Sequence, residues 1–152
     1  MKAISMMFAG LLLALGMGSA AAADHGSAAE ATAMVSKAID YMKKNGRDKA
    51  YAEINNPKGQ FVDRDLYVVV YDLNGKVMAH GSNAKMIGKE LIDMRDTDGK
   101  YFVKERVEIA KGKGSGWQDY KFMNPVSRKI EPKSMFLQRY EDVIVGCGIY
   151  KG

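Results

Sequence analysis

Leu66-Tyr-Val-Val-Val-Tyr-Asp-Leu-Asn-Gly-Lys-Val-Met-Ala-His80 is the stretch that says most about the fold. Two apolar runs flank Asp72-Leu-Asn-Gly75, and Asn-Gly is the strongest short-range hairpin signal because both residues tolerate a positive φ. An isolated hairpin is marginally stable in water, so this one predicts a larger sheet that buries it. The second strand ends at His80, whose side chain can turn into a pocket on one face of that sheet.

Two helices are expected before the hairpin. Ser27-Ala-Ala-Glu30 is a capping box, in which a hydroxyl and a carboxylate pair with the free amides at a helix start, and Asn45-Gly46 ends that helix. A shorter helix should run from Asp48, as its cap, to about Asn55. The long helix has one apolar face, formed by residues spaced three and four apart. These residues are Ala31, Met34, Val35, Ala38, Tyr41 and Met42.

The second half of the chain predicts a helical middle and three more strands. A third helix should span about 100–111, with Asp96 or Asp98 as its cap. The remaining strands are expected at about 116–123, 134–140 and 143–151. Because strands joined by tight turns are antiparallel, the fold class is α+β. The expected architecture is a five-stranded antiparallel sheet with the long N-terminal helix packed on one face.

Residues 1–23 have the composition of a secretory signal peptide. Lys2 gives a positive start, residues 6–17 form an apolar core, and Ser19-Ala-Ala-Ala-Ala23 supplies small residues for cleavage. We therefore expect a cleaved leader and a single domain over residues 24–152, exported to the periplasm or secreted. The alternative is that the leader stays in place as an anchor.

The charge balance favours a small anion over a nucleic acid as partner. The chain has 23 basic and 18 acidic residues, and loss of the leader removes one lysine, which leaves a net charge of about +4. The two signs are interspersed, and no basic stripe with interleaved aromatic residues occurs. Nucleic-acid binding is therefore not expected.

Several short pieces, in a fixed order, point to a known module. They are 66–80, Ile87-Gly-Lys89, Asp96-Thr-Asp-Gly-Lys100, Gly116-Trp-Gln-Asp-Tyr120, Asn124-Pro125, Lys133, Tyr140 and Val145-Gly-Cys-Gly-Ile-Tyr150. Taken together, the set resembles the single Cache domain, the PAS-like extracellular sensor module of bacterial chemoreceptors and sensor kinases. The resemblance implies that a small organic ligand, often a short carboxylate, binds between the sheet and its flanking loops.

One feature departs from that family. Its members usually sit between two transmembrane helices, whereas this sequence stops at Lys151-Gly152, directly after the last expected strand. The expectation is a solo module that acts in chemotaxis or signal transduction through a separate membrane receptor or kinase.

Five residues are candidates for binding a carboxylate. His80 is a donor at a strand end, and Lys133 opens a strand where the resemblance places pocket residues. Trp117 and Tyr120 lie on the neighbouring strand, where their rings would exclude the water that screens an ammonium charge. Their odd spacing puts them on opposite faces of a regular strand. Tyr67 is the fifth candidate, and the alternative for His80 and Lys133 is an ordinary solvated or satisfied position.

No pattern predicts catalysis, a cofactor or a metal. Cys147 cannot form an intramolecular disulfide because it is the only cysteine, and its apolar run predicts a buried hydrophobe. As a nucleophile it would need a basic partner, for which His80 is the one candidate in the folded part. The acidic residues between 93 and 105 approach the spacing of an EF-hand, but Met94 occupies the first ligand position. An enzyme is not expected.

The leading interpretation is a non-enzymatic module that binds a small organic anion such as acetate, propionate, pyruvate or lactate. It requires a small vacant space beside the sheet, with cationic side chains at its rim. The alternative is a structural or adaptor protein that forms a homodimer through helix 27–45 without a ligand. In that case the apolar face of the helix would be exposed in the monomer.

Overall fold

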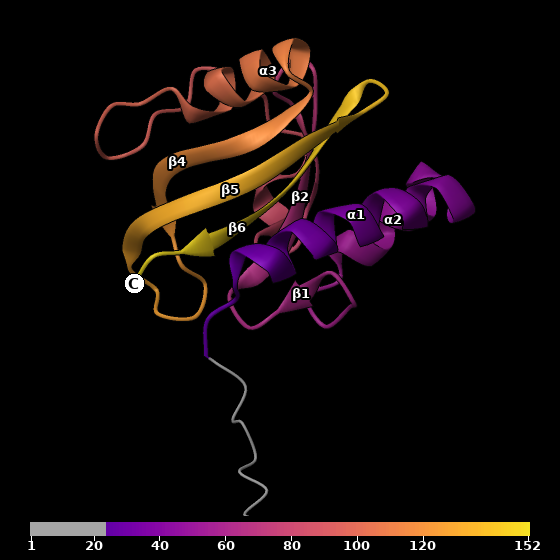
Figure 1. Cartoon of the computed structure of the whole chain (residues 1–152), viewed down its shortest axis with the longest axis horizontal. Coiled ribbons are helices and arrows are strands. Elements are labelled where there is room, and N and C mark those ends of the chain that lie inside the picture. Colours follow the sequence, from indigo (N-terminus) through magenta and orange to yellow (C-terminus); the bar gives the residue numbers. More distant parts are fainter. Residues whose placement is uncertain (1–23) are drawn as a thin grey trace, which may run out of the picture.

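The computed structural model describes residues 24–152, and the expected leader lies outside them. None of the helices in this range is both long and apolar enough to cross a membrane. Figure 1 labels the elements along the chain. They are α1 (Ala28–Asn45), α2 (Arg47–Asn55), β1 (Val62–Asp63), β2 (Leu66–Asp72), β3 (Val77–His80), the 3-10 helix η1 (Ala84–Met86), α3 (Phe102–Gly112), β4 (Ser115–Met123), β5 (Ile130–Tyr140) and β6 (Val143–Tyr150).

A six-stranded antiparallel sheet forms the centre of the molecule. Its order is β1-β2-β6-β5-β4, and β3 pairs with β2. The prediction of an α+β fold with five antiparallel strands is confirmed, and the two-residue strand β1 is added at the edge. The first and last long strands, β2 and β6, are paired, so the sheet brings two segments far apart in the sequence side by side.

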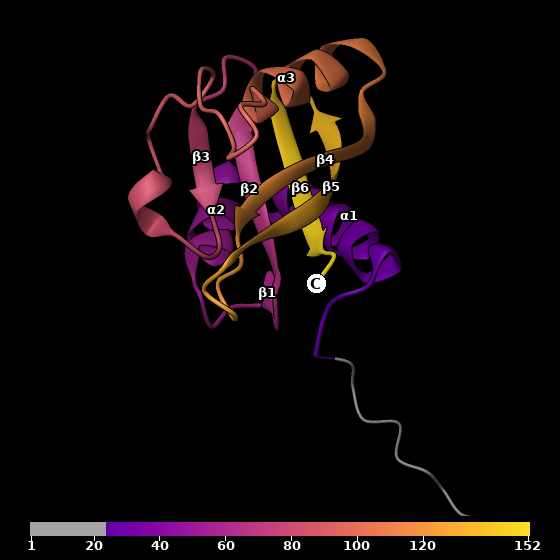
Figure 2. The same ribbon diagram turned by 90° about the vertical axis from the view of Figure 1, so that its left-hand side faces the viewer.

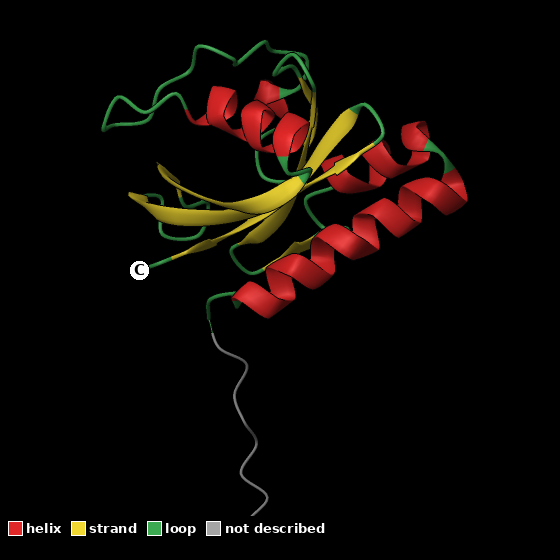
Figure 3. Ribbon diagram, turned by 45° about the horizontal axis from the view of Figure 1, so that its top comes forward, coloured by secondary structure: helices red, strands yellow, loops and turns green. Residues whose placement is uncertain are grey.

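Helices cover both faces of this sheet (Figure 3). The predicted long helix, α1, packs with α2 on one face, mainly against β6 and β5. Helix α3 lies on the other face. The segment 81–101 runs back along β3 (Figure 2), where the amide of Val77 donates to the carbonyl of Lys89 at 3.0 Å. The protein therefore has two cores, one on each side of the sheet.

Strand β2 contributes to both cores by simple alternation. Leu66, Val68 and Val70 enter the core beneath α1. Tyr67 and Tyr71 enter the core beneath α3, as period-two geometry requires. The bulky polar rings of β2 thus all lie on the α3 side.

Helix α1 begins as the sequence predicts. The Ser27 hydroxyl accepts the Glu30 amide at 3.2 Å, and the Glu30 carboxylate accepts the Ser27 amide at 2.7 Å. The apolar face is buried against the sheet of the same chain. It consists of Ala31, Val35, Ala38, Ile39 and Met42. A dimer through α1 would have this apolar face exposed in the monomer, whereas in the described chain the sheet covers it.

The starts of the other two helices differ from the predictions. Helix α2 begins at Arg47 with Gly46 as its N-cap, so Asp48 lies within the first turn. Helix α3 begins at Phe102, and its N-cap residue makes no side-chain hydrogen bond. An acidic residue in a first turn still favours a helix, because it complements the helix dipole without capping it.

Asp96, one of the two expected caps of α3, instead binds backbone amides of its own loop and of β4. Its Oδ1 accepts the amides of Asp98 and Lys100, at 2.9 and 3.0 Å, and its Oδ2 accepts the amide of Lys121 in β4 at 3.1 Å. The carboxylate therefore closes a tight turn and ties the loop before α3 to the sheet.

Strand β5 is longer than predicted, because it begins at Ile130 instead of 134. Pro132 lacks an amide proton, and this made the segment resemble a loop. In the structure the Pro132 carbonyl accepts the amide of Lys151, just beyond the end of β6 at Tyr150. The missing donor thus falls where β6 has ended, and Lys133 lies inside the strand.

The turn between β2 and β3 depends on Gly75. Its φ is +88°, and its amide donates to the carbonyl of Asp72 at 3.3 Å. Asn74 keeps a negative φ, so only the glycine of the Asn-Gly pair is left-handed. A Cβ at position 75 would lie 3.1 Å from side-chain atoms of Ile92 and Val103.

We expect Gly75→Ala to lower the free energy of unfolding by about 1–3 kcal/mol, since it combines a left-handed backbone with tight contacts. Gly112→Ala is the matched control, because that glycine ends α3 with nothing within 4 Å of the added methyl group. It should be neutral or slightly stabilising. Urea unfolding measures both, and equal midpoints for Gly75→Ala and wild type would contradict the role of the turn.

Candidate functional site

Three basic side chains are buried between the sheet and the elements that cover its α3 face. Lys133 of β5, Arg106 of α3 and His80 of β3 are each at most 2% exposed. Within residues 24–152, neither Lys133 nor Arg106 forms an ion pair with a carboxylate. Asp65 is the buried carboxylate of this range, and it accepts from His25 Nδ1 and from the Gly26 amide, both at 2.8 Å.

The Lys133 ammonium lies among tyrosine hydroxyls and rings. It donates to Tyr67 Oη at 2.8 Å and to Tyr150 Oη at 3.3 Å. It also lies 4.0 and 4.6 Å from the centroids of those two rings, and 5.9 Å from that of Phe122. Tyr150 Oη in turn donates to the carbonyl of Met123 at 2.6 Å. Aromatic faces and neutral oxygens thus stand where a counter-ion is usual.

The backbone of β6 makes room for this lysine. Lys133 is paired with Tyr120 on β4 and with Tyr150 on β6, which fixes where its side chain leaves the sheet. Its aliphatic stem crosses Gly148, and a Cβ at that position would overlap Lys133 Cε. The second glycine of Gly146-Cys-Gly148 is therefore required for the lysine to lie flat along the sheet.

Burial lowers the pKa of Lys133 from its ordinary value of 10.5 to about 7, and the charge of Arg106 acts in the same direction. The side chain therefore changes charge near neutral pH. An anion brought next to it would favour the ammonium form.

Arg106 brings a second cation from α3. Its Nε donates to Gln118 Oε1 at 3.2 Å, and Gln118 Nε2 donates to the Phe102 carbonyl at 2.6 Å. The guanidinium lies over the rings of Tyr71 and Tyr120, at 4.9 and 5.1 Å from their centroids. Its Nη2 is buried and has no hydrogen-bond partner in the described part of the chain. That atom is a free donor inside the core.

His80 is held in its neutral form. Its Nδ1 accepts the amides of Asn83 at 3.0 Å and Ser82 at 3.3 Å, so we assign the ring proton to Nε2. Burial lowers its pKa to about 3, and the charges of Lys133 and Arg106 act in the same direction. The ring stacks on Tyr67, with centroids 5.2 Å apart. His80 thus offers a neutral N–H donor and no charge.

The structure brings four of the five candidate residues to this group and leaves one out. Tyr120 is buried beside Phe102, with ring centroids 4.9 Å apart. Trp117 is 43% exposed and packs against Phe136 on the opposite side of the sheet. The reason is the odd spacing of Trp117 and Tyr120 in a regular strand.

Lys133 lies deeper than the sequence predicts. Instead of lining the rim of an open space, it is covered by the protein's own rings, as is Arg106. The rings of Phe102 and Phe122 stand edge to face, 5.9 Å apart, and form part of this cover. A charged side chain loses less free energy against an aromatic face than against an aliphatic one, which explains the arrangement.

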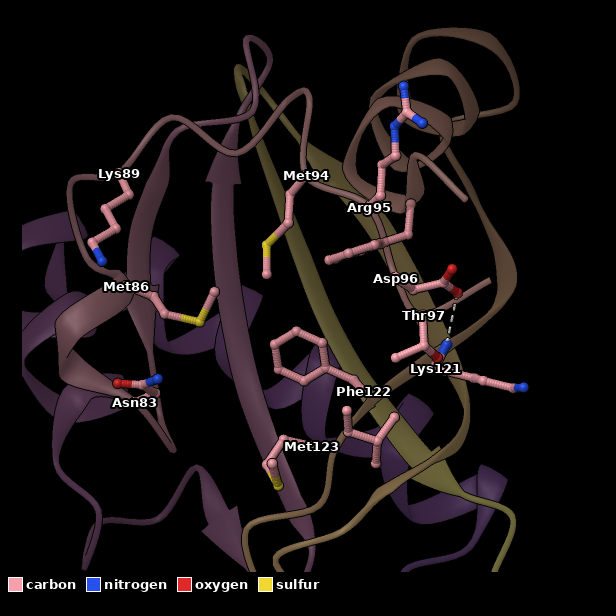
Figure 4. A pocket seen from close by; sticks show the side chains of 12 residues that line it. Asn83, Met86, Lys89, Met94, Arg95, Asp96, Thr97, Lys121, Phe122 and Met123 are labelled. Carbon is pink, nitrogen blue, oxygen red and sulfur yellow. Dashed lines mark hydrogen bonds between the residues drawn. The ribbon is translucent and has the colours of Figure 1, made fainter. Parts of the chain in front are cut away.

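A cleft of about 380 Å³ opens on the solvent side of these two rings (Figure 4). Met86 and Met94, which precede α3, face Phe122 and Met123 of β4 across it. We call it the methionine cleft. Its apolar lining consists of Met86, Met94, Phe102, Phe122, Met123 and Ile130.

A second groove of about 290 Å³ reaches Lys133 and Tyr120 from the edge of the sheet. Its walls are polar and are held by ion pairs. Lys121 pairs with Asp98 and Lys151 pairs with Asp119, each at 3.0 Å. The two openings therefore differ in chemistry, one apolar and one charged.

Two further members of the site were missed from the sequence. Arg106 follows Phe102 by four residues and Val103 by three, so it lies on the apolar face of α3, where a charged residue is a signal. Tyr150 could have been found from the turn at Glu141-Asp142. Counting equal numbers of residues away from that turn along both strands pairs Tyr150 with Lys133.

Other residues considered for chemistry have structural partners. Glu105 pairs with Lys100 at 3.1 Å, and Asp98 with Lys121, at the surface. Cys147 is buried on the α1 face, its Sγ 3.8 Å from Met34 Sδ, and burial raises its pKa to about 12. Its thiol is therefore a core hydrophobe, on the other side of the sheet from the cations.

Comparison with known proteins gives a consistent family. A family model described as single Cache domain 2 matches residues 17–152. The methyl-accepting chemotaxis protein McpP of Pseudomonas putida is 29% identical over 90 residues, and the sensor histidine kinase MctS of Rhizobium johnstonii is 30% identical over 89. The matches cover 58% and 57% of this chain, but only 16% and 19% of those proteins. The chain thus spans less than a fifth of the length of these curated relatives.

Solved structures share the fold. A periplasmic sensor domain of a chemotaxis protein gives a TM-score of 0.65 at 26% identity, over 80% of this chain and 88% of the other. A methyl-accepting chemotaxis protein from Vibrio parahaemolyticus gives 0.67 at 24% identity, over 80% and 86%. A Cache chemosensory domain, described for carboxylic acid recognition, gives 0.65 at 22% identity, over 80% and 86%.

The buried charge predicts that Lys133→Met stabilises the fold. A lysine whose pKa is lower when folded binds fewer protons in that state, so the free energy of unfolding rises with pH between about 7 and 10.5. At pH 6 the variant should be more stable than wild type by about 1–4 kcal/mol, and the difference should shrink by pH 9. The two tyrosine hydroxyls keep each other as partners, 3.1 Å apart.

Urea unfolding at both pH values is the measurement. Lys104→Met is the matched control, because that lysine is exposed on α3 and its replacement should leave the pH dependence unchanged. A Lys133→Met variant less stable than wild type at pH 6 would show that the buried ammonium does not lower the free energy of unfolding.

Proposed function

The chain belongs to the single Cache domain 2 family, and from that membership we propose that it is an exported, non-enzymatic sensor domain for a short organic carboxylate. The observation that carries this proposal is the pair of buried cations, Lys133 and Arg106, that no carboxylate of residues 24–152 neutralises. A buried charge is costly unless it is paired, so the site favours an anion from outside.

The surrounding groups suit a carboxylate. Lys133 supplies charge, and the hydroxyls of Tyr67 and Tyr150 can turn to donate once an anion replaces them as acceptors for the ammonium. His80 adds a neutral N–H donor, and Arg106 Nη2 adds a donor that the described chain leaves unused. Charge-assisted hydrogen bonds of this kind are about twice as strong as neutral ones.

The proposed ligands are small acids such as acetate, propionate, pyruvate and lactate. One protein of the same fold is a Cache chemosensory domain described for carboxylic acid recognition, which supports this class. At about 1 kcal/mol for each heavy atom, acids of this size would bind no more tightly than the micromolar range.

The proposed setting is the periplasm, with signal output through a membrane receptor or kinase. The two curated relatives are a chemoreceptor and a sensor kinase, and the match covers less than a fifth of each. Binding without turnover is proposed because His80 Nδ1 is occupied by two backbone amides and Cys147 lies on the far side of the sheet.

Isothermal titration with two- to four-carbon acids tests the ligand. Wild type and Lys104→Met should bind at least one acid, whereas Lys133→Met should bind it about 30-fold or more weakly, because a buried charge pair is lost. Absence of binding by every acid, or unchanged affinity in Lys133→Met, would falsify the proposal.

Affinity should also depend on pH. Because a bound carboxylate favours the ammonium form, its pKa rises in the complex, and binding takes up a proton above pH 7. Affinity should be constant below pH 7 and fall by up to about tenfold for each unit above it. Titrations at pH 6, 7, 8 and 9, in buffers of different ionisation enthalpy, measure this. A flat profile would mean that Lys133 does not hold the anion.

A further inference from the structure

The methionine cleft is larger than a two- or three-carbon acid requires. Its volume is about 380 Å³, within the range of pockets that bind molecules well above that size. Two of its apolar residues are among the most exposed large hydrophobic side chains of residues 24–152, namely Met123 at 47% and Ile130 at 52%. Exposed apolar surface that converges on a cleft is typical of a ligand site.

The cleft and the buried cations share a wall one ring thick. Phe122 lines the cleft on one side, and the Lys133 ammonium lies 5.9 Å from its ring centroid. Phe102 also lines the cleft, and the Arg106 guanidinium lies 5.4 Å from its centroid. A change of side-chain rotamer in these rings would open the cleft to the buried cations, which brings an apolar region and a cationic region into one site.

The rim of the cleft favours an anion. Lys89, Arg95 and Lys121 border it, with Asp96 as the one carboxylate among its lining residues. Asp96 accepts three backbone amides, which lower its pKa and hold it in place although burial acts against them. Because Lys121 is paired with Asp98 at 3.0 Å, the positive excess comes from Lys89 and Arg95, and it attracts anions toward the opening. Methionine side chains adapt to ligands of different shape, which suits an apolar guest.

We propose that the natural ligand is a carboxylic acid with an apolar body longer than that of propionate, about five or more carbons in a linear chain or a phenyl-substituted acid. Its carboxylate binds Lys133, and its apolar body lies in the methionine cleft. This inference rests on the proposed function: it keeps the carboxylate site at Lys133 and extends the ligand beyond the small acids proposed above, which bind the same site more weakly. The charged groove at the sheet edge, held by Lys151–Asp119, offers no comparable apolar surface.

The test is a titration series with acetate, lactate, butyrate, hexanoate and phenylacetate on the full chain at pH 6.5. Each methylene buried in the cleft should tighten binding about three- to fourfold, so hexanoate should exceed acetate by about 100-fold. Hexanol, which has the same chain without the charge, should bind far more weakly than hexanoate. Lys133→Met should lose hexanoate binding.

A matched pair of variants probes the cleft. Ile130→Ser removes an exposed apolar side chain that lines it, and Val126→Ser removes a similar one, 62% exposed, on the same hairpin but outside it. The ratio of hexanoate to acetate affinity should fall severalfold in Ile130→Ser and stay at the wild-type value in Val126→Ser. Equal ratios in the two variants would remove the cleft from the site.

The remaining outcomes separate this inference from the function beneath it. If acetate binds and affinity stays flat or declines with chain length, the inference is overturned and the proposed function stands. Tighter binding of lactate than of butyrate would overturn the inference in the same way, since that favours the polar groove. If no acid of any length binds, both are overturned. Equal affinity for hexanol and hexanoate would overturn both as well, because it would show apolar adsorption without a carboxylate site.

Discussion

An ammonium group buried without a carboxylate partner determines which residues can surround it in this molecule. Lys133 is satisfied by two tyrosine hydroxyls and by aromatic faces, a weaker set of partners than an acid would be. Several other features follow from it. Gly148 must lack a side chain so that the lysine can lie along the sheet. Burial lowers the pKa of His80 and keeps it neutral, and the two cations act in the same direction. Under the proposed function, the cost of the unpaired charge favours binding of an incoming carboxylate.

The two faces of the sheet differ in the chemistry of the cores that they bury. Beneath α1 and α2, the core is mainly aliphatic and small side chains with Phe61 among them, and Cys147 is one more hydrophobe. Beneath α3, the core mixes tyrosines and phenylalanines with the cations and with Gln118. Alternation along β2 and β6 supplies both faces from the same strands. A ligand can therefore change the charge and packing of one layer while the other continues to hold the sheet together.

The layer of rings between the cations and the methionine cleft connects recognition to the rest of the structure. Phe102 is the first residue of α3, and its ring packs the start of that helix against Tyr120 and Phe122 of β4. Its carbonyl accepts from Gln118, which in turn accepts from Arg106, so the helix start, β4 and a buried cation form one network. The loop before α3 is tied to β4 through Asp96. Phe122 joins Lys133 to this network, because its ring centroid lies 5.9 Å from the Lys133 ammonium and 5.9 Å from that of Phe102. Under the proposed function, an anion bound at Lys133 would therefore have a contiguous physical route to α3 and its loop.

Local features of this protein could be derived from the amino-acid sequence. The hairpin at 66–80, the capping box at Ser27 and the face on which Tyr67 lies all follow from spacing over a few residues, and the structure has each of them. Which polar groups are buried together depends instead on how distant segments pack. Arg106 and Lys133 lie near the same ring, that of Tyr120, because α3 crosses the sheet there. The strand register places Tyr120, Lys133 and Tyr150 in one row. Burial of a long cationic side chain depends on the residue opposite it, here Gly148, and periodicity along one strand carries no information about that neighbour.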